Sequence, residues 1–285
     1  MTMSNLELTT LARAAAEEAG DRIREAYGTG FRVDTKTSAI DLVTEIDQEA
    51  ERIITESLLR EVPGSSVFGE EYGGGASSDG IRWIVDPIDG TNNFVIGQPY
   101  FAVSIGVERD GDVVGGVVHD PIHRESYWAA DDQAWRGDDP LPKASDEPGR
   151  LGLFTGQPVQ GLAPHPDDLG GYMNLLKSFG VVRSMGAIAL QLADVATGKG
   201  HATIELTAPA PWDIAAGFAL ARGTGCTIER LTGDVPGYGT WGSHSFIISR
   251  DPAVVERVAP ELRRILERGE IPKGFLTAQE ALKSS

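Results

Sequence analysis

The chain has 285 residues, of which 41% are hydrophobic, and its formal net charge is −17. This length and composition predict a folded globular protein with one large domain or two packed lobes. The acidic charge would repel DNA, RNA and anionic lipid, so no nucleic-acid or membrane partner is expected. No apolar run approaches the roughly 20 residues of a membrane span, and residues 1–20 lack the basic start and apolar block of a signal peptide, which favours a cytoplasmic location. A single cysteine, Cys226, excludes a disulfide framework within the chain.

Two helices are expected in the first sixty residues. Residues 6–27 place apolar side chains on one helical face, at Leu8, Leu11, Ala15, Ala19 and Ile23. Residues 44–59 repeat apolar side chains every three or four positions, at Ile46, Ala50, Ile53, Ile54 and Leu58. Asp41 and Thr44 are candidate caps of this second helix, and Pro63 with Gly64 would end it.

Strand patterns follow. A short strand at 66–69 would deliver Glu70 and Glu71 into a glycine-rich loop, and residues 81–85 are typical of a buried strand. Residues 101–108 and 112–119 are expected to pair around Arg109-Asp110-Gly111, with a further short strand at 127–130. The acidic stretch 131–150 contains three prolines. It predicts a boundary between two lobes, residues 1–145 and 146–285.

Most of the elements expected in the second half of the sequence are helices. They are expected at residues 167–179, 186–198, 212–223 and 252–268, with a late strand at 246–249 and a tail at 269–285. The alternation of strands and helices predicts a layered α/β protein.

The segment VDPIDGTNNF, residues 85–94, places two carboxylates, Asp86 and Asp89, at the end of the buried strand. Layered folds usually keep their chemistry at strand ends, and clusters of oxygen ligands suit Mg²⁺, Mn²⁺ or Ca²⁺. An ordinary turn explains Asp-Pro-Ile-Asp-Gly equally well. The following Gly90-Thr91-Asn92 favours a site, because glycine permits close approach of the backbone and N–H groups at a helix start bind anions.

Other known phosphate and metal motifs fit poorly. The chain has no G-x-x-x-x-G-K-[ST] motif, which argues against a P-loop enzyme. Phosphatases that form an aspartyl-phosphate place two aspartates two residues apart, whereas Asp86 and Asp89 are three apart. His119 and His123 have the spacing of a zinc pair, but Pro121 would break the helix needed to align them.

Four segments together resemble the inositol monophosphatase family of Mg²⁺-dependent, lithium-inhibited phosphatases. They occur in the family's order, at residues 41–47 (DLVTEID), 69–71 (GEE), 85–94 (VDPIDGTNNF) and 211–217 (PWDIAAG). The resemblance extends from about Leu8 to Ser249. It implies an α/β (α+β) layered α-β-α-β-α sandwich of two lobes, with the site between them and usually a homodimer.

The resemblance also implies the metal ligands. Glu70, Asp86 and the backbone carbonyl of Ile88 would hold a first Mg²⁺, and Asp86, Asp89 and Asp213 a second, with Mn²⁺ as a substitute. Glu70 would reach a third ion through water. Lithium inhibition is attributed to the second site. The ordinary alternatives are a solvated loop carboxylate for Glu70 and a helix N-cap for Asp213.

Asp47 and Thr91 match the family pair that activates the attacking water, and Lys36 matches a lysine near the site. The ordinary alternatives are a solvated helix carboxylate for Asp47 and a surface lysine for Lys36. Backbone groups of Gly90 and Thr91 would bind the phosphate. Two divalent ions would neutralise the phosphate, lower the pKa of a bound water and stabilise the leaving alkoxide, without a phosphoenzyme.

Substrate choice is expected to depend on residues 183–205. Glu205 resembles a glutamate that hydrogen-bonds a substrate hydroxyl, although it lies eight residues before Asp213, one more than expected. Gly186-Ala187-Ile188 stands where inositol-binding members often have Gly-Ser/Thr-Ala, so one hydroxyl is missing. Arg183 keeps the basic residue of the family.

The leading hypothesis is therefore a Mg²⁺-dependent phosphomonoesterase of a small polyol phosphate, with myo-inositol 1-phosphate first. Histidinol phosphate is the alternative substrate, followed by sugar bisphosphates and 3′-phosphoadenosine nucleotides. A hypothesis from another class is a non-catalytic phosphate-binding or regulatory protein. Such proteins usually lose a metal ligand or the activating pair, and this chain keeps all of these residues, Asp47, Glu70, Asp86, Asp89, Thr91 and Asp213.

Overall fold

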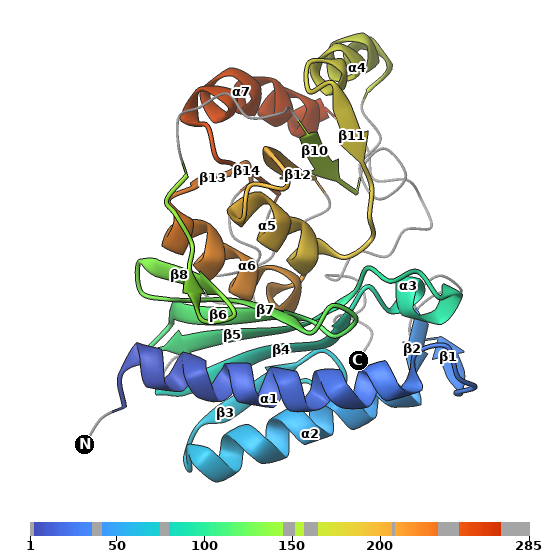
Figure 1. Ribbon diagram of the computed structural model, residues 1–285. Coiled ribbons are helices and arrows are strands. Elements are labelled where there is room, and N and C mark those ends of the chain that lie inside the picture. The colour runs from blue at the N-terminus through green and yellow to red at the C-terminus, as the bar shows by residue number, and fades with distance from the viewer. Residues whose placement is uncertain are drawn as a thin grey trace.

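The computed structural model describes residues 3–35, 42–74, 80–144, 152–156, 165–206, 209–232 and 245–268. The helical layers are built from α1 (Asn5–Ala26), α2 (Glu45–Glu61), α4 (Leu169–Lys177), α5 (Ile188–Ala196), α6 (Pro211–Thr224) and α7 (Pro252–Arg268). Helices α1 and α2 cover one face of a first sheet, α5 and α6 lie between this sheet and a second, and α4 and α7 lie beyond the second (Figure 1). The chain is thus the expected α-β-α-β-α layered α/β fold. In the described residues, no helix combines the length and apolar character needed to cross a membrane.

The first sheet has seven strands in the order β3-β4-β5-β6-β7-β8-β9. They are β3 (Ser66–Gly69), β4 (Ile81–Asp89), β5 (Ala102–Arg109), β6 (Asp112–Asp120), β7 (Glu125–Ala130), β8 (Gln133–Arg136) and β9 (Asp139–Pro140). β3 and β4 are parallel, whereas the other neighbours are antiparallel. The hairpin predicted around residues 109–111 is confirmed, and Asp110 and Gly111 there adopt positive φ angles of 52° and 89°.

The second sheet has five strands in the order β11-β10-β12-β14-β13. They are β10 (Gly152–Thr155), β11 (Val181–Arg183), β12 (Ala202–Glu205), β13 (Thr227–Arg230) and β14 (Phe246–Ser249). The sequence pattern predicts only β14 among them, because strands of three or four residues are too short to show a clear alternation. A separate antiparallel pair, β1 (Val33–Thr35) and β2 (Leu42–Thr44), precedes α2.

Local capping explains where α2 begins. Thr44 Oγ1 accepts hydrogen bonds from the N–H groups of Ile46 and Asp47, at 3.1 and 3.3 Å. The Asp47 carboxylate accepts in return from the Thr44 N–H at 2.8 Å, which completes a capping box. The cap predicted at Thr44 is therefore confirmed, while Asp41 lies outside the described residues.

Several expected segments have different boundaries in the structure. The helix expected at 186–198 runs from Ile188 to Ala196, and the strand expected at 81–85 extends to Asp89. The helix expected at 167–179 begins as a 3₁₀ turn, η1 (Pro166–Asp168), and α4 ends at Lys177. Residues 133–140, predicted as part of a lobe boundary, form β8 and β9, because Trp135 stacks on Trp128 with ring centroids 4.3 Å apart. Residues 145–150 and the tail 269–285 lie outside the described residues, so the division at residue 145 stays a prediction.

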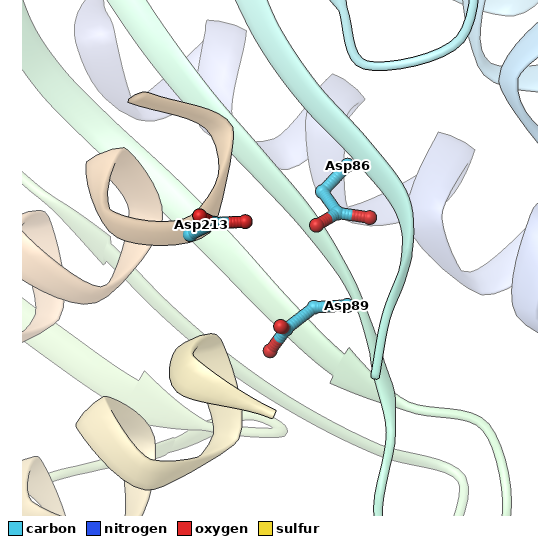
Figure 2. A group of neighbouring side chains, drawn as sticks. All are labelled: Asp86, Asp89 and Asp213. Carbon is cyan, nitrogen blue, oxygen red and sulfur yellow. The ribbon is translucent and has the colours of Figure 1, made fainter. Parts of the chain in front are cut away.

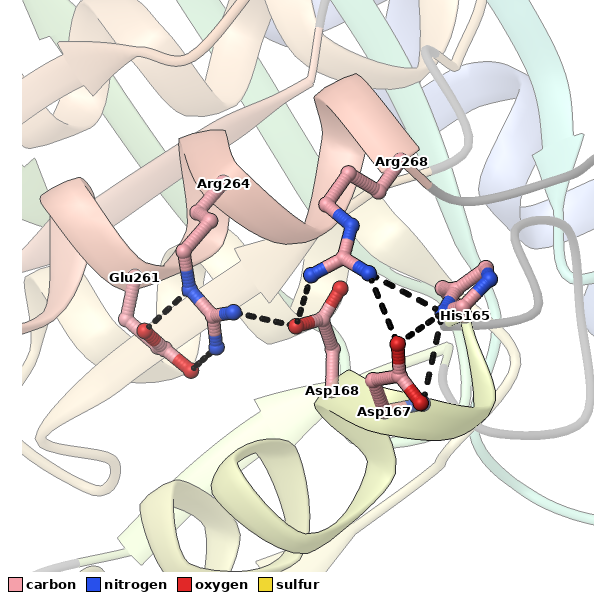
Figure 3. Close-up of polar contacts among 6 residues, drawn as sticks. All are labelled: His165, Asp167, Asp168, Glu261, Arg264 and Arg268. Atoms are coloured by element: carbon pink, nitrogen blue, oxygen red, sulfur yellow. Dashed lines mark hydrogen bonds and ion pairs between the residues drawn. The ribbon is translucent and has the colours of Figure 1, made fainter.

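A network of ion pairs joins η1 to α7 at the far side of the second sheet (Figure 3). The Asp168 side chain is fully buried and pairs with Arg264 and with Arg268, the latter at 3.1 Å. Asp167 pairs with Arg268 at 3.0 Å. Two guanidinium groups thus compensate one buried carboxylate, which would otherwise be costly to desolvate. The network anchors the polypeptide that leads through α4 into β11.

Glycines in the first sheet let α6 approach the strand backbones. A Cβ atom on Gly106 would lie 2.6 Å from Ala215 Cβ, and one on Gly116 would lie 2.5 Å from Ala216 Cα. Both distances are shorter than van der Waals contact, so only glycine fits at these positions. Because Asp213 lies in the first turn of the same helix, this close packing also sets the distance of Asp213 from the sheet.

We expect Gly116→Ala to lower the free energy of unfolding by about 1–3 kcal/mol, because the added methyl group overpacks the contact with α6. Gly30→Ala is the matched control, since nothing lies within 4 Å of its added Cβ, and it should leave stability unchanged or slightly raised. Urea unfolding of both variants measures the difference. Equal stability of the two would contradict the packing argument.

Candidate active site

Three carboxylates converge between the first sheet and α6. Asp86 and Asp89 come from the end of β4 and Asp213 from the start of α6 (Figure 2). One carboxylate oxygen from each lies within 4.8 Å of the others. Asp86 and Asp89 are buried, and Asp213 is half-buried. The structure therefore brings together residues 127 positions apart, counted from Asp86 to Asp213.

An irregularity in β4 turns two of these carboxylates to the same side. Residues three apart in a regular strand point to opposite faces. Asp86 lies opposite Ser104 and Asp89 opposite Ala102, so β4 contains one extra residue over this stretch. Pro87 lies inside this bulge, where a missing N–H costs no ladder hydrogen bond. The bulge explains how an odd spacing can place both aspartates in one cluster.

Backbone N–H groups hold Asp89 in place. Its carboxylate oxygens accept hydrogen bonds from Ile188 and Ala189 in the first turn of α5, at 3.1 and 2.7 Å. The positive end of a helix dipole favours a carboxylate at this position. Asp86 accepts from the Ile88 N–H at 3.0 Å.

Asp213 belongs to the cluster and also helps to cap α6, as the third residue of the helix and not as its N-cap, which is Ala210. Its Oδ2 accepts from the Ala210 N–H at 2.8 Å. The preceding carbonyl, that of Trp212, accepts from Ser104 Oγ of β5 at 2.9 Å. Ser104 lies opposite Asp86 in the sheet, so one hydrogen bond connects the start of α6 to the strand pair that carries Asp86.

The cluster is electrostatically unfavourable without a cation. Burial raises the pKa of Asp86 well above its usual range, and the charges of Glu70, Asp89 and Asp213 raise it further. Burial and the charge of Asp213 likewise raise the pKa of Asp89, although the α5 N–H groups act in the opposite direction. A divalent cation bound among these oxygens would reverse this preference and stabilise the ionised forms. The chemistry of the donors therefore fits a hard metal ion.

Asp47 and Thr91 lie beside the cluster. Thr91 Oγ1 lies 2.9 Å from Asp47 Oδ1 and 3.0 Å from the carbonyl oxygen of Ile88. Asp47 is buried. The alternative interpretation, a solvated helix carboxylate, is therefore wrong. Burial raises its pKa, the hydrogen bonds from Thr44 and Thr91 lower it, and the net shift is upward.

Glu70 follows β3 and is half-buried. Its N–H donates to the carbonyl oxygen of Val85 at 3.1 Å, which places it next to the strand that carries Asp86. Glu70 lies outside the group of three aspartates, but its carboxyl group contributes by charge and by hydrogen bonding to the raised pKa of Asp86, after burial. The Ile88 carbonyl oxygen, one residue before Asp89, contacts Thr91 Oγ1.

Residues expected at the substrate side are brought together only in part. Gly90 has a φ angle of +94°, and a Cβ atom there would lie 3.0 Å from Ala187 Cβ and 3.3 Å from the Gly186 carbonyl oxygen. Gly90 therefore packs directly against the 186–187 segment, and it precedes the short helix α3 (Thr91–Ile96). Ala187 is buried, whereas Arg183 at the end of β11 is exposed. Lys36 lies outside the described residues.

Glu205 ends β12 and is buried. It accepts a hydrogen bond from the Gly156 N–H at 3.1 Å. Burial raises its pKa to about 8; the Gly156 hydrogen bond opposes this shift, and the charge of Asp213 adds to it. Glu205 is thus a buried carboxyl group whose pKa lies well above that of an ordinary glutamate, in part because of the charge of Asp213.

Sequence reasoning missed Glu51 and Asn93. Glu51 is a buried carboxylate one helical turn after Asp47, and Asn93 Nδ2 donates to the carbonyl oxygens of Tyr100 and Met185, both at 2.7 Å. The four-residue spacing of Asp47 and Glu51, each next to an apolar position of α2, is the sequence signal that both carboxylates lie on the buried side of the helix. Nothing in the sequence pattern indicates the contact of Asn93 with residue 185.

Glu205→Gln is expected to stabilise the metal-free protein, increasingly as the pH rises from about 5 to about 8. The wild-type carboxyl group ionises near 4.5 when unfolded but near 8 when folded, so wild-type stability is lost over this interval. Glutamine cannot ionise and can still accept from Gly156. Urea unfolding of both proteins in chelator across this pH range measures the effect, and parallel stability curves would contradict it.

Comparisons with known proteins identify the family. The model of the inositol monophosphatase family matches residues 4–267. The inositol-1-monophosphatase of Bacillus subtilis is 33% identical over 231 residues, covering 80% of this chain and 87% of that protein. Nus factor SuhB of Pasteurella multocida is 32% identical over 264 residues, covering 91% and 97%.

Solved structures are similar over the same length. The extragenic suppressor protein SuhB of Bartonella henselae aligns with a TM-score of 0.73 at 30% identity, covering 93% of this chain and 98% of that one. SaIMPase-II with bound inositol monophosphate aligns with a TM-score of 0.67 at 26% identity, covering 91% and 94%. The chain therefore belongs to the inositol monophosphatase family.

Proposed function

We propose that the protein is a Mg²⁺-dependent phosphomonoesterase of a small polyol phosphate, with myo-inositol 1-phosphate as its first candidate substrate. The convergence of Asp86, Asp89 and Asp213 beside the Asp47–Thr91 pair carries this proposal. Membership of the family supports a phosphatase. The Bacillus relative is named an inositol-1-monophosphatase, and one structural neighbour holds inositol monophosphate, which supports the substrate class.

The residues proposed to hold cations offer only oxygen atoms, as Mg²⁺ and Mn²⁺ prefer. Glu70, Asp86 and the Ile88 carbonyl would hold one ion, and Asp86, Asp89 and Asp213 would hold another. A bound divalent cation supplies charge neutralisation and Lewis acidity to phosphate-ester hydrolysis. The proposal explains why the fold keeps three carboxylates so close together at a partly buried position.

Asp47 and Thr91 are proposed to direct the attacking water. Thr91 Oγ1 lies 2.9 Å from Asp47 Oδ1 and 3.0 Å from the Ile88 carbonyl oxygen. When its proton points to Asp47, a lone pair of the hydroxyl is left to accept from water. As the water oxygen bonds to phosphorus, its proton passes to the Thr91 oxygen and the Thr91 proton passes to Asp47 Oδ1. The bond from phosphorus to the ester oxygen breaks, and the leaving alkoxide takes a proton from solvent water. The raised pKa of Asp47 suits a proton acceptor. Backbone N–H groups of Gly90 and Thr91 would orient the phosphate oxygens.

Glu205 is proposed to contact a hydroxyl group of the substrate. Glu205 is buried, one of its oxygens accepts from the Gly156 N–H, and the charge of Asp213 contributes to its raised pKa. Arg183, Gly186, Ala187 and Lys36 are proposed to complete the substrate side. The buried methyl group of Ala187 against Gly90 offers no hydroxyl, so an inositol ring would depend more on Glu205.

A role outside catalysis is the second candidate, because a relative that covers 91% of this chain is named Nus factor SuhB. This name favours a regulatory partner function. The geometry of Asp47 and Thr91 argues for catalysis, since a protein that only binds would not need that pair. The two functions can be separated by measuring turnover.

Phosphate release in Mg²⁺ should be fastest with inositol 1-phosphate when histidinol phosphate and fructose 1,6-bisphosphate are compared under the same conditions. Lithium and chelator should each abolish it. Asp89→Asn is the control, because loss of one ligand charge should remove turnover without unfolding the protein. Preference for histidinol phosphate would reassign the substrate, and no release from any of the three would favour the non-catalytic candidate.

Thr91→Ala should lower kcat by about 10²- to 10⁴-fold with little change in KM, because the route for the water proton is lost. Thr91→Ser keeps the hydroxyl group and should retain most of the activity. Steady-state kinetics of both variants at saturating Mg²⁺ test the assignment. Similar kcat values for the alanine and serine variants would exclude Thr91 from proton transfer.

A further inference from the structure

Glu51 is a buried carboxylate to which none of the roles above has been assigned. It lies on α2, and its side chain is almost inaccessible to solvent. Its Oε2 accepts a hydrogen bond from the Glu71 N–H at 2.7 Å, and its Oε1 accepts from the Tyr72 N–H at 3.1 Å. Two backbone donors therefore compensate the burial of this carboxylate, as charge-assisted hydrogen bonds can.

The two donors belong to the turn that carries Glu70. This turn is closed by a hydrogen bond from the Gly69 N–H to the Gly73 carbonyl at 3.0 Å. Its outer end also contacts α2, because the Tyr72 hydroxyl donates to the Gln48 carbonyl at 3.3 Å. The turn is thus held against α2 by three hydrogen bonds, two of which end on Glu51.

Gly69 provides the space that the Glu51 carboxylate occupies. A Cβ atom at position 69 would lie 2.0 Å from Glu51 Oε1 and 2.4 Å from Cδ. No side chain can be accommodated there unless the carboxylate moves. The glycine of the GEE segment is therefore explained by this contact and not by an unusual backbone angle, since Gly69 is not among the residues with positive φ.

One face of α2 consequently contacts two parts of the candidate site, Thr91 and the turn that carries Glu70. Asp47 and Glu51 are four residues apart and lie on the same side of the helix. Asp47 contacts Thr91, and Glu51 contacts the turn after Glu70. A single rigid helix thus sets the position of the proposed proton acceptor relative to the proposed metal ligand.

We propose that Glu51 is a positioning residue, whose carboxylate holds the Gly69–Tyr72 turn so that Glu70 faces Asp86 and the site binds its divalent cation tightly. The inference rests on the proposed function, because it takes Glu70 to be a metal ligand. Groups that orient metal ligands typically contribute about 10- to 100-fold to metal affinity. Glu51 acts through Glu70 and does not touch substrate.

The test compares Glu51→Gln with Glu56→Gln in the full-length protein freed of metal. Glutamine offers one acceptor oxygen, and its NH₂ group would face a backbone N–H, so one of the two hydrogen bonds is lost. Glu56 lies on the same helix in an exposed pair with Arg52 and serves as the matched control. Mn²⁺ binding followed by electron paramagnetic resonance should weaken about 10- to 100-fold in Glu51→Gln alone.

Hydrogen exchange of the Glu71 and Tyr72 amides provides a readout that needs neither metal nor substrate. These amides should exchange faster in Glu51→Gln than in the wild type or in Glu56→Gln. In kinetic assays, the half-saturating Mg²⁺ concentration should rise while kcat at saturating Mg²⁺ is retained. If Glu51→Gln fails to fold, Gly69→Ala tests the same contact, because it keeps every carboxylate and displaces only that of Glu51.

A lower melting temperature with unchanged Mn²⁺ affinity would overturn the inference and leave Glu51 a purely structural residue. Failure of the proposed function is a different result, namely a wild-type protein that binds no Mn²⁺ and releases no phosphate. The wild-type titration therefore separates the two.

Discussion

Mutual repulsion among three carboxylates, two of them buried and one half-buried, is the constraint on which this structure depends. Asp86, Asp89 and Asp213 lie within 4.8 Å of one another where burial already raises the pKa of two of them. Such a cluster would relax apart or become protonated unless the surrounding fold held it and a cation balanced it. Backbone N–H groups of Ile88, of the first turn of α5 and of Ala210 hold Asp86, Asp89 and Asp213, respectively.

The middle helical layer provides much of that support. The first turn of α5 donates two N–H groups to Asp89, and the first turn of α6 is capped by Asp213. Both helices therefore direct the positive ends of their dipoles at the carboxylates. The glycines at 106 and 116 allow α6 to lie against the strands, so the same close packing that stabilises the layers also defines the shape of the site.

The outer helix α2 supports the other side. Its N-terminal capping box orients Asp47 toward Thr91, and the next turn places Glu51 against the loop after Glu70. Both acidic side chains of this face are buried in contacts with other elements. Three separate helices, α2, α5 and α6, therefore fix the positions of the acidic side chains that gather at this site.

The sequence by itself determined the features that depend on neighbouring residues: the capped start of α2 at Thr44, the hairpin at 109–111, and the four ordered segments that indicate the family. Tertiary structure decided the rest. The short strands of the second sheet, the burial of Asp47 and Glu51, and the meeting of Asp213 with β4 all depend on contacts between distant segments. The bulge after Asp86 is the sharpest case, because a spacing of three predicts opposite faces and only pairing with β5 reveals the extra residue.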